Sequence, residues 1–230
     1  MKNKPYCDID FSEEAIEFYR KGNRLRYLYA SKIIKKIKNK TIVADIGCFG
    51  GVLHPFLKEA GCEIIEGFDV DEKSVYAASR LYDKAYVWNI ENQKAPVEDE
   101  RYDIAIALEV IEHLYNIDNF LEEVKRILKI GGYFIVSTPN MTSLYNRFRV
   151  LIGKMPFNAP SLSYKYVKEK GLNPSHAKLG NMYEWKFVFE SYGFKINSIK
   201  STGNTILTNF IGKIKPSLGS TLFFILNKKY

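Results

Sequence analysis

The sequence predicts a doubly wound α/β fold built on a mostly parallel β-sheet. Three observations lead to this fold class. Short β-branched, apolar segments alternate with amphipathic helical segments through residues 41–140. The segment 103–109 is apolar on both faces, as expected of a central parallel strand. A glycine-rich turn at residues 47–51 joins the first of these strands to the helical segment that follows it.

The first 40 residues are expected to form a helical segment ahead of the sheet. Asp10 and Ser12 can cap a helix that begins near Glu13. Apolar residues keep a helical period from Ile16 onward, with a weak point at Gly22.

Residues 41–140 contain five expected strands and the helices between them. The expected strands are 41–45, 63–69, 85–88, 103–109 and 133–138. The expected helices are 51–60, which Gly61 ends, 72–82, which Asp71 caps, and 119–129, which Gly131 and Gly132 end. A polar loop spans 93–101.

The pattern changes after Pro139. A helix over 142–152 mixes basic and large apolar residues. We expect the segment 145–154 to face the core, and the alternative is a basic amphipathic helix lying on a membrane surface. A loop-rich segment precedes a helix over 181–192 and two late strands, 194–198 and 220–227. We divide the chain into an N-terminal helical segment (1–40), a ligand-binding core (41–140), helices with a lid-like insertion (141–193) and a C-terminal strand pair (194–230).

Composition restricts the class of protein. The 230 residues suffice for one α/β domain with extensions, and 46% of them are hydrophobic, which is enough for a full core. No apolar run approaches the ~20 residues of a membrane span, and the first residues lack an apolar signal region. Cys7, Cys48 and Cys62 show no metal or redox spacing. We therefore expect reduced cysteines, a cytoplasmic protein and no metal site.

Positive charge is concentrated late in the chain. Of a net charge of +8, residues 140–230 contribute 14 lysines or arginines against three acids, Glu169, Glu184 and Glu190. This asymmetry predicts an anionic partner, such as a phosphorylated sugar or lipid, RNA or a membrane surface. The alternative is a solvated basic surface with no specific partner.

The glycine turn and two acids predict the kind of ligand. The spacing Gly47-x-x-Gly50-Gly51 does not meet the G-x-G-x-x-G pattern of dinucleotide sites. Asp45 stands at the turn, where a carboxylate would repel a pyrophosphate but suits a ligand with positive groups. Asp69 ends the second strand, where an acid can accept hydrogen bonds from both ribose hydroxyls. S-adenosylmethionine (SAM) has a sulfonium, an ammonium, a ribose and no phosphate.

The residues of this turn resemble the first motif of the class I SAM-dependent methyltransferases. That motif reads D-x-G-C-G-x-G, and this chain has Asp45-Ile46-Gly47-Cys48-Phe49-Gly50-Gly51, with Phe49 in place of the middle glycine. The resemblance implies a seven-stranded, mostly parallel, Rossmann-like sheet that ends in an antiparallel strand pair. It also implies SAM as cofactor, bound by Asp45, Gly47, Cys48, Phe49, Gly50, Gly51, Asp69, Val70, Asn89, Ile90 and Glu109.

Two further motifs indicate a branch of this family. Glu109-Val110-Ile111-Glu112-His113-Leu114 is similar to the E-V-L-E-H signature of methyltransferases that act in quinone biosynthesis. Ser137-Thr138-Pro139-Asn140 is similar to a motif of quinone O-methyltransferases and of methyltransferases from surface-glycan clusters. These resemblances imply a methyl acceptor with an oxygen or nitrogen nucleophile: a small molecule, a saccharide or a lipid-linked compound, with an anionic or phosphate-bearing group favoured by the basic C-terminal part.

His113 is the candidate catalytic residue. Methyl transfer needs alignment of the acceptor with the sulfonium, and a hydroxyl acceptor also needs its proton removed, which imidazole can do near neutral pH. The alternative for His113 is a helix-capping or carbonyl-binding role. Asn140, Tyr164 and His176 are candidate acceptor contacts, although each could instead hold a loop or pack.

Other functions stay open on the sequence alone. RNA methylation fits the charge, but the chain has no recognised RNA-binding module. A non-catalytic SAM-fold subunit is supported only by Phe49, and an NAD-dependent oxidoreductase is disfavoured by the glycine spacing and by Asp45.

Overall fold

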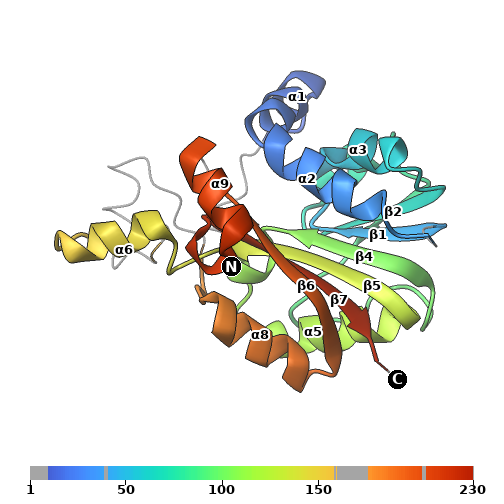
Figure 1. Cartoon of the computed structure of the whole chain (residues 1–230). Coiled ribbons are helices and arrows are strands. Elements are labelled where there is room, and N and C mark those ends of the chain that lie inside the picture. Colours follow the sequence, from blue (N-terminus) through green and yellow to red (C-terminus); the bar gives the residue numbers. More distant parts are fainter. Residues whose placement is uncertain (1–9, 39–40, 158, 160–175, 204–205, 230) are drawn as a thin grey trace.

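The computed structural model describes residues 10–38, 41–157, 159, 176–203 and 206–229. Its strands form one sheet in the order β3-β2-β1-β4-β5-β7-β6 (Figure 1). The strands are β1 (Ile42–Ile46), β2 (Ile64–Asp69), β3 (Lys84–Val87), β4 (Tyr102–Leu108), β5 (Leu128–Pro139), β6 (Phe194–Thr202) and β7 (Thr221–Lys228). The helices are α1 (Glu13–Gly22), α2 (Arg24–Ile34), α3 (His54–Glu59), α4 (Glu72–Ala78), α5 (Ile117–Ile127), α6 (Leu144–Leu151), α8 (Met182–Ser191) and α9 (Ile206–Ile214), with short 3₁₀ turns η1 (Phe49–Gly51), η2 (Ile111–His113) and η3 (Pro216–Leu218).

The topology confirms the predicted fold class. Strands β1 to β5 run parallel, and β7 inserts antiparallel between β5 and β6. The two late strands therefore form the antiparallel pair that the sequence predicts at one edge of the sheet.

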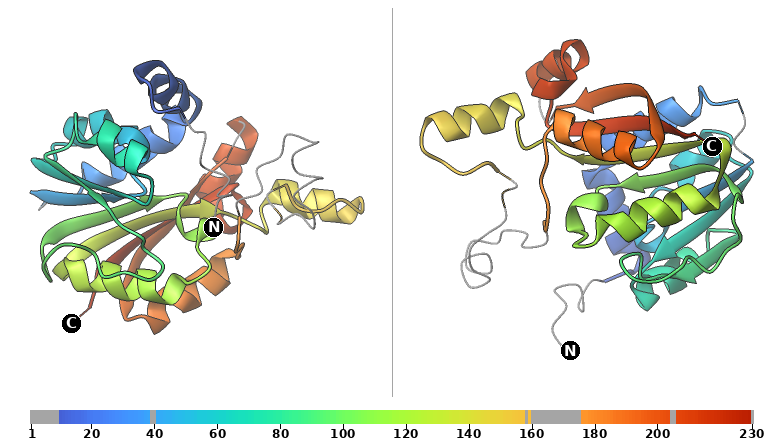
Figure 2. Two further views of the ribbon diagram at one scale, coloured as in Figure 1. Left: turned by 180° about the vertical axis from the view of Figure 1, so that it is seen from behind. Right: turned by 90° about the horizontal axis from the view of Figure 1, so that it is seen from below.

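Helices cover both faces of the sheet and enclose two apolar cores (Figure 2). On one face α5 and α8 pack Phe120, Trp185 and Phe189 against the sheet. On the other face α1 to α4 pack residues such as Ile34 and Leu57. The break between α1 and α2 falls at Asn23, next to the predicted weak point, and Ser12 caps α1 through the N–H of Ala15.

The end of α5 differs from the prediction. We expected Gly131 and Gly132 to end this helix, but α5 ends at Ile127 and β5 already begins at Leu128. The two glycines lie inside β5, beside an irregularity in its pairing with β4. A side chain at Gly132 would lie 2.8 Å from the carbonyl oxygen of Lys129, so the glycine permits this bend in the strand.

The late part of the chain contains the second difference. We expected the helix over 142–152 to face the core, but Asn146 is the one buried residue of α6, which extends away from the sheet (Figures 1 and 2). The long connection before β7, for which the sequence predicts no helix or strand, contains α9 and η3.

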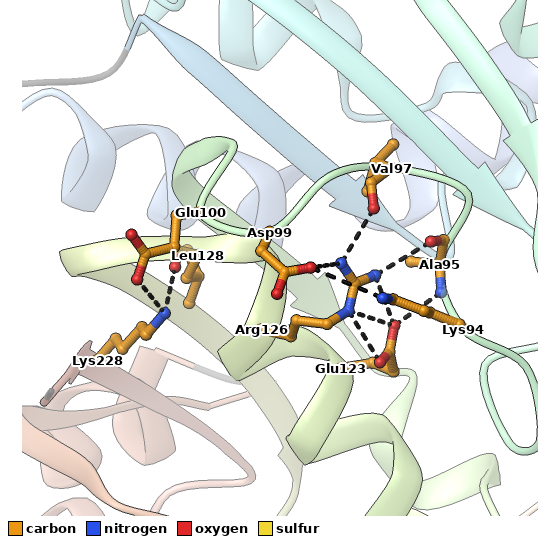
Figure 3. A network of polar contacts seen from close by, with 9 residues as sticks. All are labelled: Lys94, Ala95, Val97, Asp99, Glu100, Glu123, Arg126, Leu128 and Lys228. Carbon is orange, nitrogen blue, oxygen red and sulfur yellow. Dashed lines mark hydrogen bonds and ion pairs between the residues drawn. The ribbon is translucent and has the colours of Figure 1, made fainter.

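A polar network fixes the loop that precedes β4 (Figure 3). The guanidinium of Arg126 on α5 donates to the carbonyl oxygens of Val97 at 3.0 Å and Ala95 at 3.1 Å, and it pairs with Asp99 at 2.6 Å. The ammonium of Lys228 on β7 donates to the carbonyl oxygen of Leu128 at 2.8 Å. These bonds fix the amino ends of β4 and β5, whereas ligands of open α/β sheets usually bind at the carboxyl ends of the strands.

Among the residues that the structure describes, no helix is both long enough and apolar enough to cross a membrane.

Candidate active site

The predicted ligand-binding residues meet along the carboxyl ends of the parallel strands. Backbone bonds join neighbouring ends: the N–H of Trp88 donates to the carbonyl oxygen of Asp69 at 2.8 Å, and that of Gly47 donates to Phe68 at 2.8 Å. The N–H of Glu109 donates to the carbonyl oxygen of Ser137 at 3.1 Å. Residues that are distant in sequence thereby lie together at the carboxyl ends of the strands, where ligands usually bind in open α/β sheets.

The glycine turn needs glycine at its first position. Gly47 has φ +73, and a Cβ there would lie 2.5 Å from Cγ2 of Val110. Gly50 and Gly51 also have positive φ, and so does Phe49, at φ +43. Backbone strain at a non-glycine residue persists only where the surroundings hold it. The turn is therefore a tightly held loop rather than a generic bend.

Phe49 packs against the N-terminal helix. Its ring centroid lies 5.2 Å from that of Phe11 and 4.9 Å from that of Tyr19, both edge-on. Nearby, Nε of Arg20 donates to the carbonyl oxygen of Val52 at 3.2 Å. The residue that departs from the family motif thus attaches α1 to the turn. Sequence reasoning missed these partners because the contact joins two segments with no shared pattern.

Asp69 holds the turn in place with its carboxylate. Oδ2 accepts from the N–H of Phe49 at 3.0 Å and from the hydroxyl of Ser74 at 2.7 Å, and Oδ1 accepts from the N–H of Asp71 at 3.1 Å. A carboxylate offers about four acceptor positions, so one remains on Oδ1. Val70, the next residue, is exposed.

Asp45 and Cys48 are buried beneath the carboxyl ends of the strands. Asp45 is 3% exposed and accepts a hydrogen bond from the hydroxyl of Tyr82. Burial raises the pKa of Asp45 to about 7, and the charge of Asp69 adds to the rise, while the Tyr82 hydrogen bond opposes it. Because Asp45 is buried, a ligand at the turn would interact with it by longer-range electrostatics rather than by a hydrogen bond. Burial likewise keeps the pKa of the Cys48 thiol well above its usual value.

Asn89 and Ile90 follow β3 at the end of the row. Oδ1 of Asn89 accepts from the N–H of Glu91 at 3.3 Å. The backbone N–H of Asn89 donates to the side-chain oxygen of Gln93 at 3.1 Å. The side chain thus has a loop-holding bond, and Ile90 is 8% exposed.

Glu109 stands at the end of β4 with an unusual backbone and two partners. It has φ +56, it accepts from the hydroxyl of Ser137 at 2.9 Å, and it pairs with Arg26 of α2 at 3.1 Å. The ion pair is a second attachment of the N-terminal helices to the strand ends.

Next to Glu109 the fold brings two histidines and a buried acid together. The ring centroids of His113 and His176 lie 5.0 Å apart. The backbone N–H groups of Ala177 and Lys178 donate to the carbonyl oxygen of Glu112 at 2.8 and 3.0 Å. Because His176 comes much later in the chain than His113, no local pattern predicts this pairing.

Glu112 itself is fully buried, and neither carboxylate oxygen has a hydrogen-bond partner among the described residues. Burial, reinforced by the charge of Glu109, raises the pKa of Glu112 well above its usual value. The ligand atoms of Glu112, His113 and His176 lie within 4.8 Å of one another, a set that could hold a metal ion where we had expected none.

Comparison with known proteins finds methyltransferases among the relatives of this chain. A model of the methyltransferase domain matches residues 44–136, the segment that contains the turn and the strand ends. The chain is 28% identical to the ubiquinone biosynthesis O-methyltransferase of Rickettsia prowazekii over 223 residues, covering 80% of this chain and 86% of that protein. These matches support a class I SAM-dependent methyltransferase.

Solved structures agree with this assignment at the level of the fold. A SAM-dependent methyltransferase from Archaeoglobus fulgidus superposes with a TM-score of 0.65 at 20% identity, covering 90% of this methyltransferase and 94% of that chain. The PH0226 protein of Pyrococcus horikoshii superposes with a TM-score of 0.67 at 19% identity, covering all of both chains.

The residues at the carboxyl ends of the parallel strands are chemically suited to the cofactor of the methyltransferase, SAM. The turn lets backbone approach a ligand closely, and the carboxylates of Asp69 and Glu109 can accept hydrogen bonds from hydroxyl and ammonium groups. When bound, SAM supplies a methyl group already activated by the sulfonium.

The remaining predicted acceptor contacts of the methyltransferase are placed differently. Asn140 is 1% exposed, and its amide donates to the carbonyl oxygens of Ser217 at 2.9 Å and Gly219 at 2.8 Å. Its oxygen accepts from the N–H of Thr142 at 3.1 Å. The protein itself therefore uses both ends of this amide. Tyr164 lies outside the described residues.

Proposed function

We propose that this methyltransferase transfers the SAM methyl group to a hydroxyl oxygen of a small-molecule, saccharide or lipid-linked acceptor, with His113 as the general base. The observation that carries the proposal is the pairing of His113 with His176 beside Glu109, at the end of β4. A hydroxyl needs an acceptor for its proton as it attacks, whereas the activated methyl carbon needs only alignment.

The residues would divide this chemistry between them. The acceptor oxygen forms a bond to the methyl carbon while the carbon–sulfur bond breaks, and its proton passes to an imidazole nitrogen of His113. Glu109 pairs with Arg26 at 3.1 Å and so holds the N-terminal helices at the same strand end. Burial raises the pKa of Glu112 well above its usual value, which favours its neutral form beside the two histidines.

The cofactor would lie along the strand ends with each part against a different element. We assign the methionine end to the turn at residues 47–51, the ribose to Asp69 and the adenine to Asn89 and Ile90. Asp69 keeps one acceptor position on Oδ1, so one ribose hydroxyl can bind without loss. To accept hydrogen bonds from both ribose hydroxyls, Asp69 has to lose one of the two hydrogen bonds that its Oδ2 accepts from Phe49 and Ser74.

Two observations support the class of acceptor. The relatives named ubiquinone biosynthesis O-methyltransferases are, by that name, enzymes that methylate oxygen. Lys178 is exposed, and its backbone is fixed on the carbonyl oxygen of Glu112 at 3.0 Å, which puts a cation two residues from His176. An acceptor with a phosphate or carboxylate group would find a partner there.

The proposal is tested by supplying methyl-labelled SAM and the purified enzyme to an extract fractionated into lipid, glycan, RNA and small molecules. We expect label in the lipid, glycan or small-molecule fraction as an alkali-stable methyl ether. Label confined to RNA, or absent while SAM still binds, would contradict the proposal.

A variant separates catalysis from binding. His113→Gln should lower kcat by about 10²- to 10⁴-fold, the usual contribution of a general base, with SAM affinity unchanged in calorimetry. His176→Gln should have a smaller effect on kcat. Equal activity of wild type and His113→Gln would remove His113 from the reaction.

A further inference from the structure

Residues 143–157, here called the α6 finger, carry large apolar side chains into solvent. The finger leaves the end of β5 and extends away from the sheet in every view (Figures 1 and 2). Phe148 is 60% exposed, Leu151 83% and Met155 67%. The other exposed apolar residues of the finger are Leu144, Tyr145, Val150, Ile152 and Phe157. Apolar surface gathered in one place marks an interaction site.

The finger is a built element, because its returning chain is bonded to its helix. The amide of Asn146 donates to the carbonyl oxygen of Asn140 at 3.1 Å and accepts from the N–H of Phe157 at 2.9 Å. Nε of Arg149 donates to the carbonyl oxygen of Met155 at 2.8 Å. The fold therefore holds these apolar side chains outward.

The charge on and around the finger has one sign. Arg147, Arg149 and Lys154 are its charged residues, and the sequence has no aspartate or glutamate from residue 124 to residue 168. Asn140 at the base of the finger also binds the carbonyl oxygens of Ser217 and Gly219, in the connection that contains α9.

The α9 connection adds the same two features to this end of the molecule. Phe210 is 62% exposed and Ile214 71%, and Lys213 and Lys215 are exposed beside them. No acidic residue follows Glu190 in the chain. The finger and the α9 connection therefore each combine exposed apolar groups with basic residues and no acidic one.

We propose that the α6 finger docks the enzyme on an anionic phospholipid bilayer, inserting Phe148, Leu151 and their neighbours among the acyl chains while the basic residues meet the lipid phosphates. With about 100° between successive residues, the exposed apolar residues from Leu144 to Ile152 cover more than half of the helix circumference. Fluid lipid can surround an element on several sides, whereas a protein groove takes one stripe. The single sign of charge matches anionic headgroups.

The test is co-flotation of the full chain with vesicles of phosphatidylcholine alone, or of phosphatidylcholine mixed with phosphatidylglycerol. We expect binding to the anionic vesicles that weakens with added salt. Phe148→Ser/Leu151→Ser should lower partitioning by about 10- to 100-fold. Lys154→Gln/Lys213→Gln, which leaves the backbone bonds of Arg149 intact, should lower it several-fold.

A matched control removes exposed apolar groups elsewhere. Leu25 is 75% exposed on α2 and Phe187 73% on α8, and Leu25→Ser/Phe187→Ser should bind vesicles as the wild type does. The proposal is overturned if the wild type does not float with anionic vesicles. It is also overturned if the control variant Leu25→Ser/Phe187→Ser loses as much binding as the finger variant Phe148→Ser/Leu151→Ser. It is also overturned if light scattering shows a dimer that only the finger variant dissociates, without vesicle binding, because the finger would then be a self-association surface.

Discussion

Helices α5 and α6 look alike in sequence and behave in opposite ways in the structure. Both have large apolar residues at helical spacing among charged ones. In α5 the residues Phe120, Leu121, Val124 and Ile127 are fully buried, whereas in α6 Phe148 and Leu151 are mostly exposed. Amphipathic pattern alone therefore does not decide where a helix packs.

The difference comes from the connections. Helix α5 joins the parallel neighbours β4 and β5, so it has to return across the face of the sheet. Helix α6 follows β5, whose other neighbour is the antiparallel β7, and α8 already covers the adjoining face with Trp185 and Phe189. Nothing in the topology draws α6 back onto the core.

The largest expected contrast is in stability. Phe120→Ala should lower the free energy of unfolding by about 3–5 kcal/mol because it leaves a cavity in a packed core. Phe148→Ala should change it by less than about 0.5 kcal/mol, because this side chain is 60% exposed. Urea denaturation of both variants measures the difference, and comparable losses would mean that α6 packs on the protein.

The core also buries acids, which the finger lacks, and this predicts a dependence on pH. Because burial raises the pKa of Asp45 to about 7, the folded state favours its protonated form. The resulting stability is full below the unfolded pKa of ~3.9 and is lost as the pH rises to about 7, by at most about 4 kcal/mol.

The variant Asp45→Asn should remove this titration. Its unfolding free energy, measured by urea denaturation from acid to neutral pH, should fall less steeply than that of the wild type. Parallel curves for the two proteins would show that Asp45 does not titrate in this range.

Two glycines have nearly the same backbone conformation but different surroundings. Gly47 has φ +73 in the core turn, and Gly153 has φ +71 at the end of α6. Alanine at either position should cost about 1–2 kcal/mol for the left-handed backbone. Gly47→Ala should cost about 1–3 kcal/mol more, since its Cβ overlaps Val110 at 2.5 Å while that of Gly153 meets nothing within 4 Å. Equal melting temperatures of the two variants would contradict this.

The sequence predicted the fold well where the signal is local. Strand periodicity, the glycine turn and the caps at Ser12 and Asp71 depend on neighbouring residues, and the structure confirms them. The prediction that Gly131 and Gly132 end helix α5 was wrong, because glycine occurs at strand irregularities as well as at helix ends. The exposure of α6 depends on which surface is already covered, which no local pattern contains.

The candidate site divides in the same way. Asp69 and Glu109 could be found because acids at strand ends fall on one edge of a parallel sheet. The contacts of Phe49 with Phe11 and Tyr19, the pairing of Arg26 with Glu109, and the meeting of His176 with His113 join distant segments. Those partners became visible only in the fold.

The core should hold SAM at the strand ends without help from the finger, and calorimetric titration with S-adenosylhomocysteine measures this. Wild type and Leu151→Ser should bind alike, and Asp69→Asn should bind about 10- to 100-fold more weakly, because a charge-assisted hydrogen bond is lost. No heat of binding in the wild type, or equal affinity of Asp69→Asn and wild type, would show that the strand ends do not hold the cofactor in this way.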